Sequence, residues 1–384
     1  MLTFNLPLLI RLFFRSLFRT KNTHFQLTTK RIRILIGFVV ITPFLFITSW
    51  IGFFLDHIFF PGFRKTQIKR PVFIIGNFRS GSTFLHRILA LDTINFSCFK
   101  TWEIYLAPSI CQRKVARGFL MIDSLFGSPF RKFADKFERK NLSTIRLHKV
   151  GLRQPEEDEG LFLYIWRCIF IWFFFPDYKN ARPYHFFDTS FSLSLRRSVM
   201  RFYKKMLQRH MYSNTGAFYF LSKNPSFTPK IRSLADTFPD AKFIYLVRDP
   251  VATFTSAVSW FNFGFSFFCS PLEKYPFQDE IIDMIKHWYN YPIEAFKRLP
   301  NKNTIYIKYD ALVKDPKTTI QKIYRKFSLP MSGFFRNILD HEAEEAKLFK
   351  STRKTTPDEI GMSRKTLKKK FHDIYKHYKF DIHE

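Results

Sequence analysis

The most constraining feature of the sequence is the stretch Pro71–Asp92, PVFIIGNFRSGSTFLHRILALD. Its first apolar residues, Val72 to Ile75, are typical of a strand that is buried on both faces. A turn with two glycines follows, and apolar residues then recur at a helical spacing up to Leu91. This order predicts a site for an anionic group, because backbone N–H groups at a helix N-terminus face the turn and the helix dipole favours negative charge.

The residues of the turn indicate which anion it binds. Gly76 and Gly81 have the spacing of the phosphate-binding pattern G-x-x-x-x-G-K-[ST], and Thr83 occupies its last position. Ser82 stands where that pattern has a lysine, and Arg79 is the only cation in the turn. The missing lysine disfavours a nucleoside triphosphatase, because that residue reaches the β- and γ-phosphates. A compact dianion, held by an arginine fork, backbone amides and hydroxyls, fits the turn better.

The segment GNFRSGSTFLHRIL resembles the 5′-phosphosulfate loop of sulfotransferases that use 3′-phosphoadenosine 5′-phosphosulfate (PAPS). It is most similar to the branch that holds tyrosylprotein sulfotransferases and many bacterial enzymes. The resemblance implies a P-loop-like three-layer α/β/α domain with a central parallel sheet over residues 71–384. It also implies in-line transfer of a sulfuryl group from PAPS to an acceptor hydroxyl, without a metal ion. The loop residues that would bind the donor are Arg79, Ser80, Gly81, Ser82 and Thr83.

Two later motifs resemble the rest of the donor site in this family. The resemblance assigns Lys223, in a Lys-Asn-Pro turn, to the bridging oxygen of the donor, where it would stabilise charge on the leaving phosphate. A lysine at the carboxyl end of a strand also points into the crevice where ligands bind in α/β sheets. Arg248 ends a predicted strand and Ser256 follows eight residues later, which matches the site of the donor's 3′-phosphate. Arg353 or Lys354 is a further candidate for that phosphate.

Two carboxylates are candidates for the base that takes the proton of the acceptor hydroxyl. In the resembled family a glutamate shortly after the loop helix has this role, and Glu103 is the only carboxylate between Asp92 and Asp123. The run Glu156–Glu159 resembles acidic clusters of bacterial relatives, so Glu157 is the reserve candidate. A surface glutamate, or acids that complement a helix N-terminus, are the structural alternatives.

Apolar patterns predict further elements beyond the turn. Phe218–Leu221, Ala241–Val247 and Thr304–Tyr309 are expected to be strands, and Asp310–Phe327 is expected to be a helix. Leu161–Phe175 is apolar but short for a membrane span, and it is expected to be a buried helix. Strands that alternate with helices in this way predict a parallel sheet.

The first seventy residues predict a membrane-anchor segment. Ile34–Leu55 is uncharged and long enough to cross a hydrocarbon core of about 30 Å. Pro43 lies in its middle, so a kinked span and a re-entrant hairpin are both open, beside a buried soluble helix. Leu8–Phe18 is expected to be a basic amphipathic helix on an anionic bilayer. Basic residues flank the apolar stretch on both sides, so the positive-inside rule gives no orientation for a single span, whereas a hairpin would keep both flanks cytoplasmic.

Composition narrows the partners of the chain. The sequence contains 62 Lys and Arg against 31 Asp and Glu, a formal net charge of +31. This charge favours a phosphate-rich donor or an anionic membrane surface, and a general bias of composition is the alternative. Nucleic acid is not expected, because no nucleic-acid-binding module is apparent. Four widely spaced cysteines predict neither a zinc site nor a disulfide framework.

The sequence thus predicts a membrane-associated, PAPS-dependent sulfotransferase with its catalytic domain facing the cytoplasm. The acceptor is an unidentified alcohol, which is lipid-linked, a carbohydrate or another hydroxyl compound, and the oligomeric state is not predicted. One alternative is a nucleotide-dependent kinase or NTPase with a degenerate P-loop. The missing lysine and the presence of Arg248 and Ser256 disfavour it. A second is a non-enzymatic, PAPS-binding membrane scaffold, which the presence of Lys223 and Glu103 disfavours.

Overall fold

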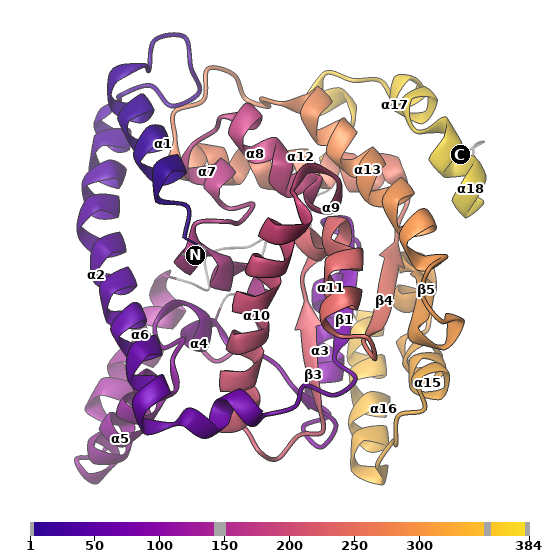
Figure 1. Cartoon of the computed structure of the whole chain (residues 1–384). Helices are drawn as coiled ribbons and strands as arrows, with labels where there is room; N and C mark the ends of the chain where they lie inside the picture. The colour runs from indigo at the N-terminus through magenta and orange to yellow at the C-terminus, as the bar shows by residue number, and fades with distance from the viewer. Residues whose placement is uncertain (1–3, 142–150, 349–354, 381–384) are drawn as a thin grey trace.

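The fold is built around a five-stranded parallel sheet with the strand order β2-β3-β1-β4-β5. Figure 1 shows the computed structural model of the chain, which describes residues 4–141, 151–348 and 355–380. The strands are β1 (Val72–Gly76), β2 (Phe96–Ser97), β3 (Tyr219–Lys223), β4 (Lys242–Val247) and β5 (Thr304–Lys308). Because every strand pair is parallel, all carboxyl ends lie at one edge of the sheet.

Helices cover both faces of the sheet, as alternate residues of β1 make clear. Val72 and Ile74 belong to one buried cluster, whereas Phe73 and Ile75 belong to a second, larger one. The first cluster includes residues of α3 (Ser82–Ala90), α15 (Pro316–Phe327) and α16 (Gly333–Leu348). The second includes residues of α10 (Leu193–Ser213), α11 (Ile231–Thr237), α12 (Pro250–Phe268) and α13 (Gln278–Phe296). The predicted three-layer α/β/α architecture is therefore confirmed.

The remaining helices lie around this core. The α-helices are α1 (Leu6–Phe18), α2 (Thr29–Phe59), α4 (Thr101–Tyr105), α5 (Ile110–Leu125), α6 (Pro129–Asn141), α7 (Ile171–Phe174), α8 (Tyr178–His185), α9 (Phe187–Ser190), α14 (Tyr309–Lys314), α17 (Arg364–Lys370) and α18 (His372–Tyr378). The 3-10 helices are η1 (Pro61–Lys65), η2 (Asp158–Ile165), η3 (Pro225–Lys230), η4 (Asn301–Asn303) and η5 (Asp358–Ile360).

Two predicted helices differ from the observed ones. The expected helix over 310–327 is divided into α14 and α15, because the side chain of Asp315 caps the second helix and Pro316 starts it. The expected single helix over 161–175 is wrong. Its residues form η2 and α7, and Trp166 between them has a left-handed backbone with φ 53°. The segment is largely buried, as the sequence predicted.

The N-terminal residues form two helices that pack along one side of the sheet domain (Figure 1). Helix α2 is continuous through Pro43, so the hairpin alternative is wrong. It is the one helix in the described ranges that is long and apolar enough to cross a membrane. Leu12 of α1 and Phe53 of α2 nevertheless belong to the same buried cluster as the sheet residues. The boundary at residue 70, which the sequence suggests between anchor and catalytic domain, stays a prediction.

The close approach of β1 to β4 gives a testable prediction. Gly76 has φ +147°, and a Cβ atom there would lie 2.5 Å from the carbonyl oxygen of Leu246. We expect Gly76→Ala to lower the free energy of unfolding by about 1–3 kcal/mol, because the strand end must move to admit the methyl group. Denaturant unfolding followed by circular dichroism measures this change.

Gly118→Ala is the matched control, because Gly118 lies inside α5 and a Cβ atom added there would have no atom within 4 Å apart from the neighbouring backbone of its own helix. Alanine is the better helix former, so this variant should gain about 0.5–1 kcal/mol. Equal stability of the two variants would contradict the tight contact between Gly76 and β4.

Candidate functional site

The turn between β1 and α3, here called the anion loop (residues 76–83), presents backbone donors at the carboxyl edge of the sheet. Gly81 precedes α3 with φ +88°, and a Cβ atom there would lie 2.8 Å from the ring of Tyr309. No side chain caps α3, so the N–H groups of its first turn are available to an anion. Phe78 holds the loop in place, with its ring stacked 4.8 Å from that of Trp260.

Buried polar side chains line the inner side of the anion loop. Ser80 is fully buried, and its hydroxyl donates to the carbonyl oxygen of Asn77 at 2.7 Å. The side-chain amide of Asn77 is itself buried, and among the described residues it has no hydrogen-bond partner. Ser82 and Thr83 occupy the first turn of α3. An unpaired buried amide beside free backbone donors is consistent with a polar ligand in the loop.

The structure brings Arg79, Arg248 and Ser256 together. Arg79 Nε donates to Ser256 Oγ at 3.1 Å, and Arg248 Nη1 donates to the carbonyl oxygen of Arg79 at 2.6 Å. Within the part of the chain that the structure describes, neither guanidinium group forms an ion pair. Burial, and then the charge of Arg248, lower the pKa of Arg79 below its ordinary value. Two neighbouring cations that form no ion pair with a carboxylate are suited to bind an anion.

Tyr309 is a site residue that the sequence reasoning missed. It directly follows β5, and β5 pairs with β4 so that Lys308 is opposite Val247. The next residue on each strand is therefore at the same edge, and the guanidinium carbon of Arg248 lies 4.4 Å from the centre of the Tyr309 ring. The ring thus fixes Arg248 from one side and approaches Gly81 from the other. The signal was its position as the last residue of the predicted strand Thr304–Tyr309, one residue beyond the observed β5.

Lys223 lies at the carboxyl end of β3, beside the anion loop. Its backbone is opposite Ile74 of β1, two residues before the loop begins. The side chain is buried, and its ammonium group donates to the carboxylate of Glu157. The side chain of Glu157 keeps 14% of its surface exposed, whereas Lys223 keeps 1%. The lysine is therefore held at the site by a partner that solvent still reaches.

The other carboxylates of the acidic run have separate partners. Burial raises the pKa of Asp158 to about 7, although hydrogen bonds from Tyr203 and Ser222 favour its ionised form. Glu159 accepts from Lys230 at 3.0 Å and is fully buried. Burial also raises the pKa of Glu156. The charge of Lys223 acts to lower this pKa, and the charge of Glu157 acts to raise it further. Asp158 and Glu159 thus hold the core beneath the site, and Glu157 and Glu156 lie near Lys223.

Glu103 has a different environment. It is 3% exposed, and its carboxylate accepts from the backbone N–H of Lys100 at 2.9 Å in a capping arrangement at the start of α4. Arg113 and His210 lie 4.0 and 3.8 Å from its two oxygens. Burial acts to raise the pKa of Glu103, but His210, Arg113 and the Lys100 amide together lower it below its ordinary value. These partners lie outside the anion loop and its cations.

Two remaining expectations concern phosphate contacts and metal ions. Arg353 and Lys354, the further candidates for a phosphate contact, lie outside the described residues. In the described ranges, no group of three or more His, Cys, Asp or Glu side chains is placed to hold a metal ion.

Comparisons of the sequence with a family model and with a known protein both identify sulfotransferases as similar. The model of the sulfotransferase family matches residues 71–333. The omega-hydroxy-beta-dihydromenaquinone-9 sulfotransferase Stf3 of Mycobacterium tuberculosis (strain CDC 1551 / Oshkosh) is 23% identical over 311 residues, which are 76% of this chain and 72% of that protein.

Two crystal structures have the same fold. Sulfotransferase STF9 from Mycobacterium avium superposes with a TM-score of 0.73 at 17% identity, covering 97% of this chain and 96% of that one. Sulfotransferase STF1 from Mycobacterium tuberculosis H37Rv gives a TM-score of 0.65 at 18% identity, covering 95% and 91%. Because the family model matches more than half of the sequence, the kinase and scaffold alternatives are set aside: the chain belongs to the sulfotransferase family and is a transferase enzyme.

Proposed function

We propose that the protein transfers a sulfuryl group from PAPS to a hydroxyl group of a membrane lipid. The observation that carries the proposal is the contact between two anion-binding parts at one edge of the sheet. The anion loop supplies backbone and hydroxyl donors, and Arg248 with Ser256 supplies a second site. Arg79 touches both parts, so a donor with a phosphosulfate and a separate phosphate fits across them.

PAPS, when bound, supplies the activated sulfuryl group and a 5′-phosphate leaving group. In the proposal, the amides at the start of α3 and the hydroxyls of Ser80, Ser82 and Thr83 hold the phosphosulfate. Arg248 and Ser256 hold the 3′-phosphate. Arg79 and Lys223 stabilise the negative charge that develops on the leaving oxygen, without a metal ion.

We assign the base to Glu157, the reserve candidate, in place of Glu103. Glu157 contacts Lys223 and remains partly exposed, so an acceptor hydroxyl can reach it beside the leaving phosphate. Glu103 is buried among Lys100, Arg113 and His210, and its lowered pKa makes it a weaker proton acceptor. In the proposed step the hydroxyl proton passes to Glu157 while the acceptor oxygen bonds to sulfur and the bond from sulfur to the phosphate oxygen breaks.

The acceptor class is proposed from two observations. The name of the Mycobacterium relative describes a hydroxylated menaquinone, a lipid quinone, as that enzyme's substrate. In this chain, α2 carries a long apolar surface beside the catalytic domain. A lipid alcohol that stays in the membrane can be reached by an enzyme bound there. We place the catalytic domain on the cytoplasmic side, because a helix that lies along one leaflet keeps both of its basic flanks on that side.

The donor is tested by incubating the full chain with [35S]PAPS or [γ-32P]ATP and a lipid extract. We expect sulfur label in the lipid fraction and no phosphorus label. Arg248→Ala should weaken binding of the product 3′,5′-bisphosphate by about 10²-fold or more, since a charged hydrogen-bonded group is lost. Isothermal titration measures this affinity. The exposed Arg336→Ala on α16 is the control and should bind normally. Label from ATP alone would refute the assignment.

The base is tested by comparing Glu157→Gln with Glu103→Gln. We expect Glu157→Gln to lower kcat by about 10²–10⁴-fold, while bisphosphate binding changes only a few-fold. Glu103→Gln should lower the unfolding midpoint through the loss of buried contacts, and the folded fraction should keep its kcat. Normal turnover in Glu157→Gln, together with a folded but inactive Glu103→Gln, would return the role to Glu103.

A further inference from the structure

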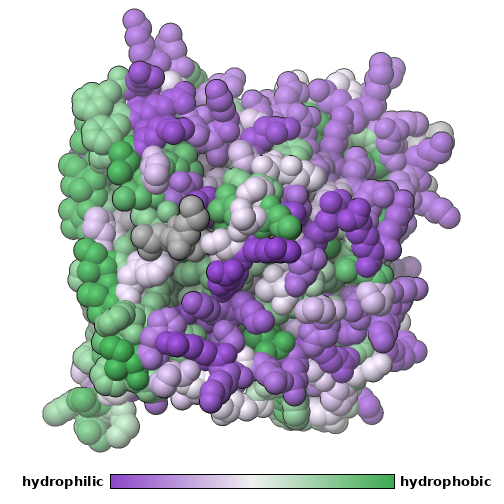
Figure 2. Space-filling model, viewed as in Figure 1, coloured by the Kyte–Doolittle hydropathy of each residue, from purple (hydrophilic) through white to green (hydrophobic). Residues whose placement is uncertain are grey.

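Helices α1 and α2 and the tip of the α5–α6 pair expose one apolar surface, which we call the membrane face. Its members include Phe14, Ile36, Val40, Phe44, Phe54 and Phe126, each more than half exposed. Figure 2 shows hydrophobic colour along the edge that α2 occupies in Figure 1 and over the tip below it. An apolar groove of about 310 Å³ between α1 and α2, lined by side chains of both, makes the surface continuous across the two helices.

The membrane face is more apolar than a surface that is exposed to water usually is. Within the most hydropathic window of α2, only 11% of the residues are buried inside the protein. Soluble monomers rarely expose contiguous apolar patches larger than a few hundred Å². Exposed basic residues lie beside it on α1 and at both ends of α2, namely Arg11, Arg19, Lys30, Arg33, Arg64 and Lys65. An apolar surface bordered by cations matches an anionic lipid leaflet, whose headgroups bind cations and whose chains receive apolar side chains.

The beginning of α2 is fixed to the catalytic domain. Arg31 is 1% exposed, and its guanidinium donates to the carbonyl oxygens of Phe268 and Phe174, each at 2.7 Å. Its guanidinium carbon lies 5.5 Å from the ring centre of Phe175. Further along the helix, Trp50 Nε1 donates to the carbonyl oxygen of Tyr164 at 3.1 Å. The apolar stretch, for which the sequence left a kinked span, a hairpin and a buried helix open, is thus attached to the domain at Arg31 and Trp50.

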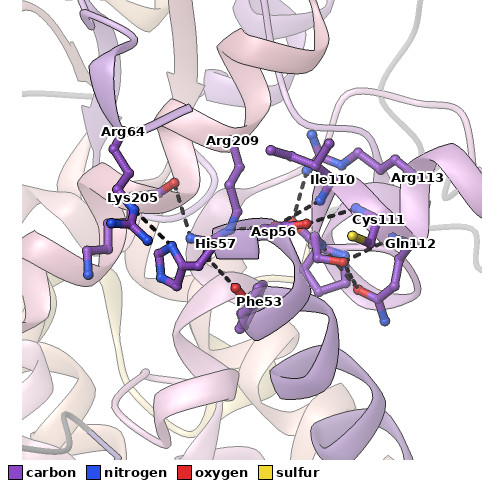
Figure 3. Close-up of polar contacts among 12 residues, drawn as sticks. Phe53, Asp56, His57, Arg64, Ile110, Cys111, Gln112, Arg113, Lys205 and Arg209 are labelled. Carbon is purple, nitrogen blue, oxygen red and sulfur yellow. Dashed lines mark hydrogen bonds and ion pairs between the residues drawn. The ribbon is translucent and has the colours of Figure 1, made fainter. Parts of the chain in front are cut away.

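The end of α2 is fixed by a buried carboxylate, as Figure 3 shows. Asp56 is fully buried and accepts from Arg209 Nε at 2.7 Å. It also accepts from the backbone N–H groups of Ile110 and Cys111 at 3.0 and 2.9 Å, so it caps α5. Detaching α2 from the domain would leave the charge of Arg209 buried without its carboxylate, which is strongly unfavourable.

From these attachments we infer that α2 lies in the plane of the membrane, within one leaflet, and does not cross it. Arg31 and Asp56 are separated by about 38 Å of helix at 1.5 Å per residue, which is longer than a hydrocarbon core of about 30 Å. A crossing helix fixed at both ends would draw the catalytic domain into the hydrocarbon. A helix in one leaflet instead leaves the basic flanks at both ends on the same side. The inference rests on the proposed membrane association and specifies its geometry.

Flotation of the purified full chain with vesicles tests the membrane face. We expect binding to vesicles of phosphatidylcholine and phosphatidylglycerol, and weaker binding to phosphatidylcholine alone. The double variant Val40→Asp, Phe54→Asp should lower the bound fraction about tenfold or more, because two charges would enter the hydrocarbon. Phe334→Asp, an exposed apolar site on α16, is the matched control and should bind normally. Full binding by the double variant, or a dimer in solution that it dissociates, would overturn lipid as the occupant.

The in-plane orientation is tested on the same vesicles with single cysteines at Lys21→Cys and Lys65→Cys, before and after α2. Protein added from outside should react at both positions with a membrane-impermeant maleimide, after subtraction of the wild-type signal. Protection of one position would overturn the in-plane orientation. Binding of 3′,5′-bisphosphate, measured in each variant, separates these results from the proposed chemistry. Vesicle binding with no sulfuryl transfer would refute the proposed function and leave the membrane face intact.

Discussion

The parallel pairing of β1 with β3 on one side and β4 on the other is the constraint on which the site depends. It places the ends of three strands at one edge, so that the anion loop, Lys223 and Arg248 meet there. Gly76 and Gly81 allow this approach, because a Cβ atom at either position would collide with β4 or with Tyr309. A parallel sheet needs long crossovers, and each crossover here contributes a helix to one of the two covering layers.

The buried charges beneath this edge explain why adjacent acids have different roles. Asp158 and Glu159 are enclosed by Tyr203, Ser222 and Lys230, where hydrogen bonds and one ion pair offset the loss of solvation. Glu157 lies at the border of the same region, paired with Lys223 and partly open. Removing a partner from a buried pair is costly, so this arrangement also fixes the lysine at the strand end.

The N-terminal helices connect the catalytic fold with its proposed surroundings. Their inner side shares the core with the sheet domain, and their outer side presents the membrane face. Buried polar anchors at Arg31 and Asp56 hold α2 against the domain at both ends. Such contacts are directional, so they define the orientation of the helix. Apolar packing is not directional and constrains this orientation less.

The sequence by itself determined the turn that forms the anion loop, the parallel α/β fold and the apolar stretch, because glycine spacing and hydrophobic period are local properties. It predicted that Arg79, Arg248 and Ser256 belong to one site, and the fold brings them into contact. Only the tertiary structure shows that Glu103 and Glu157 have different environments. It also shows that Tyr309 lies beside Arg248 and that α2 is attached to the domain. These depend on contacts between residues distant in the chain, where strand register and burial decide which side chains meet, and no local pattern encodes them.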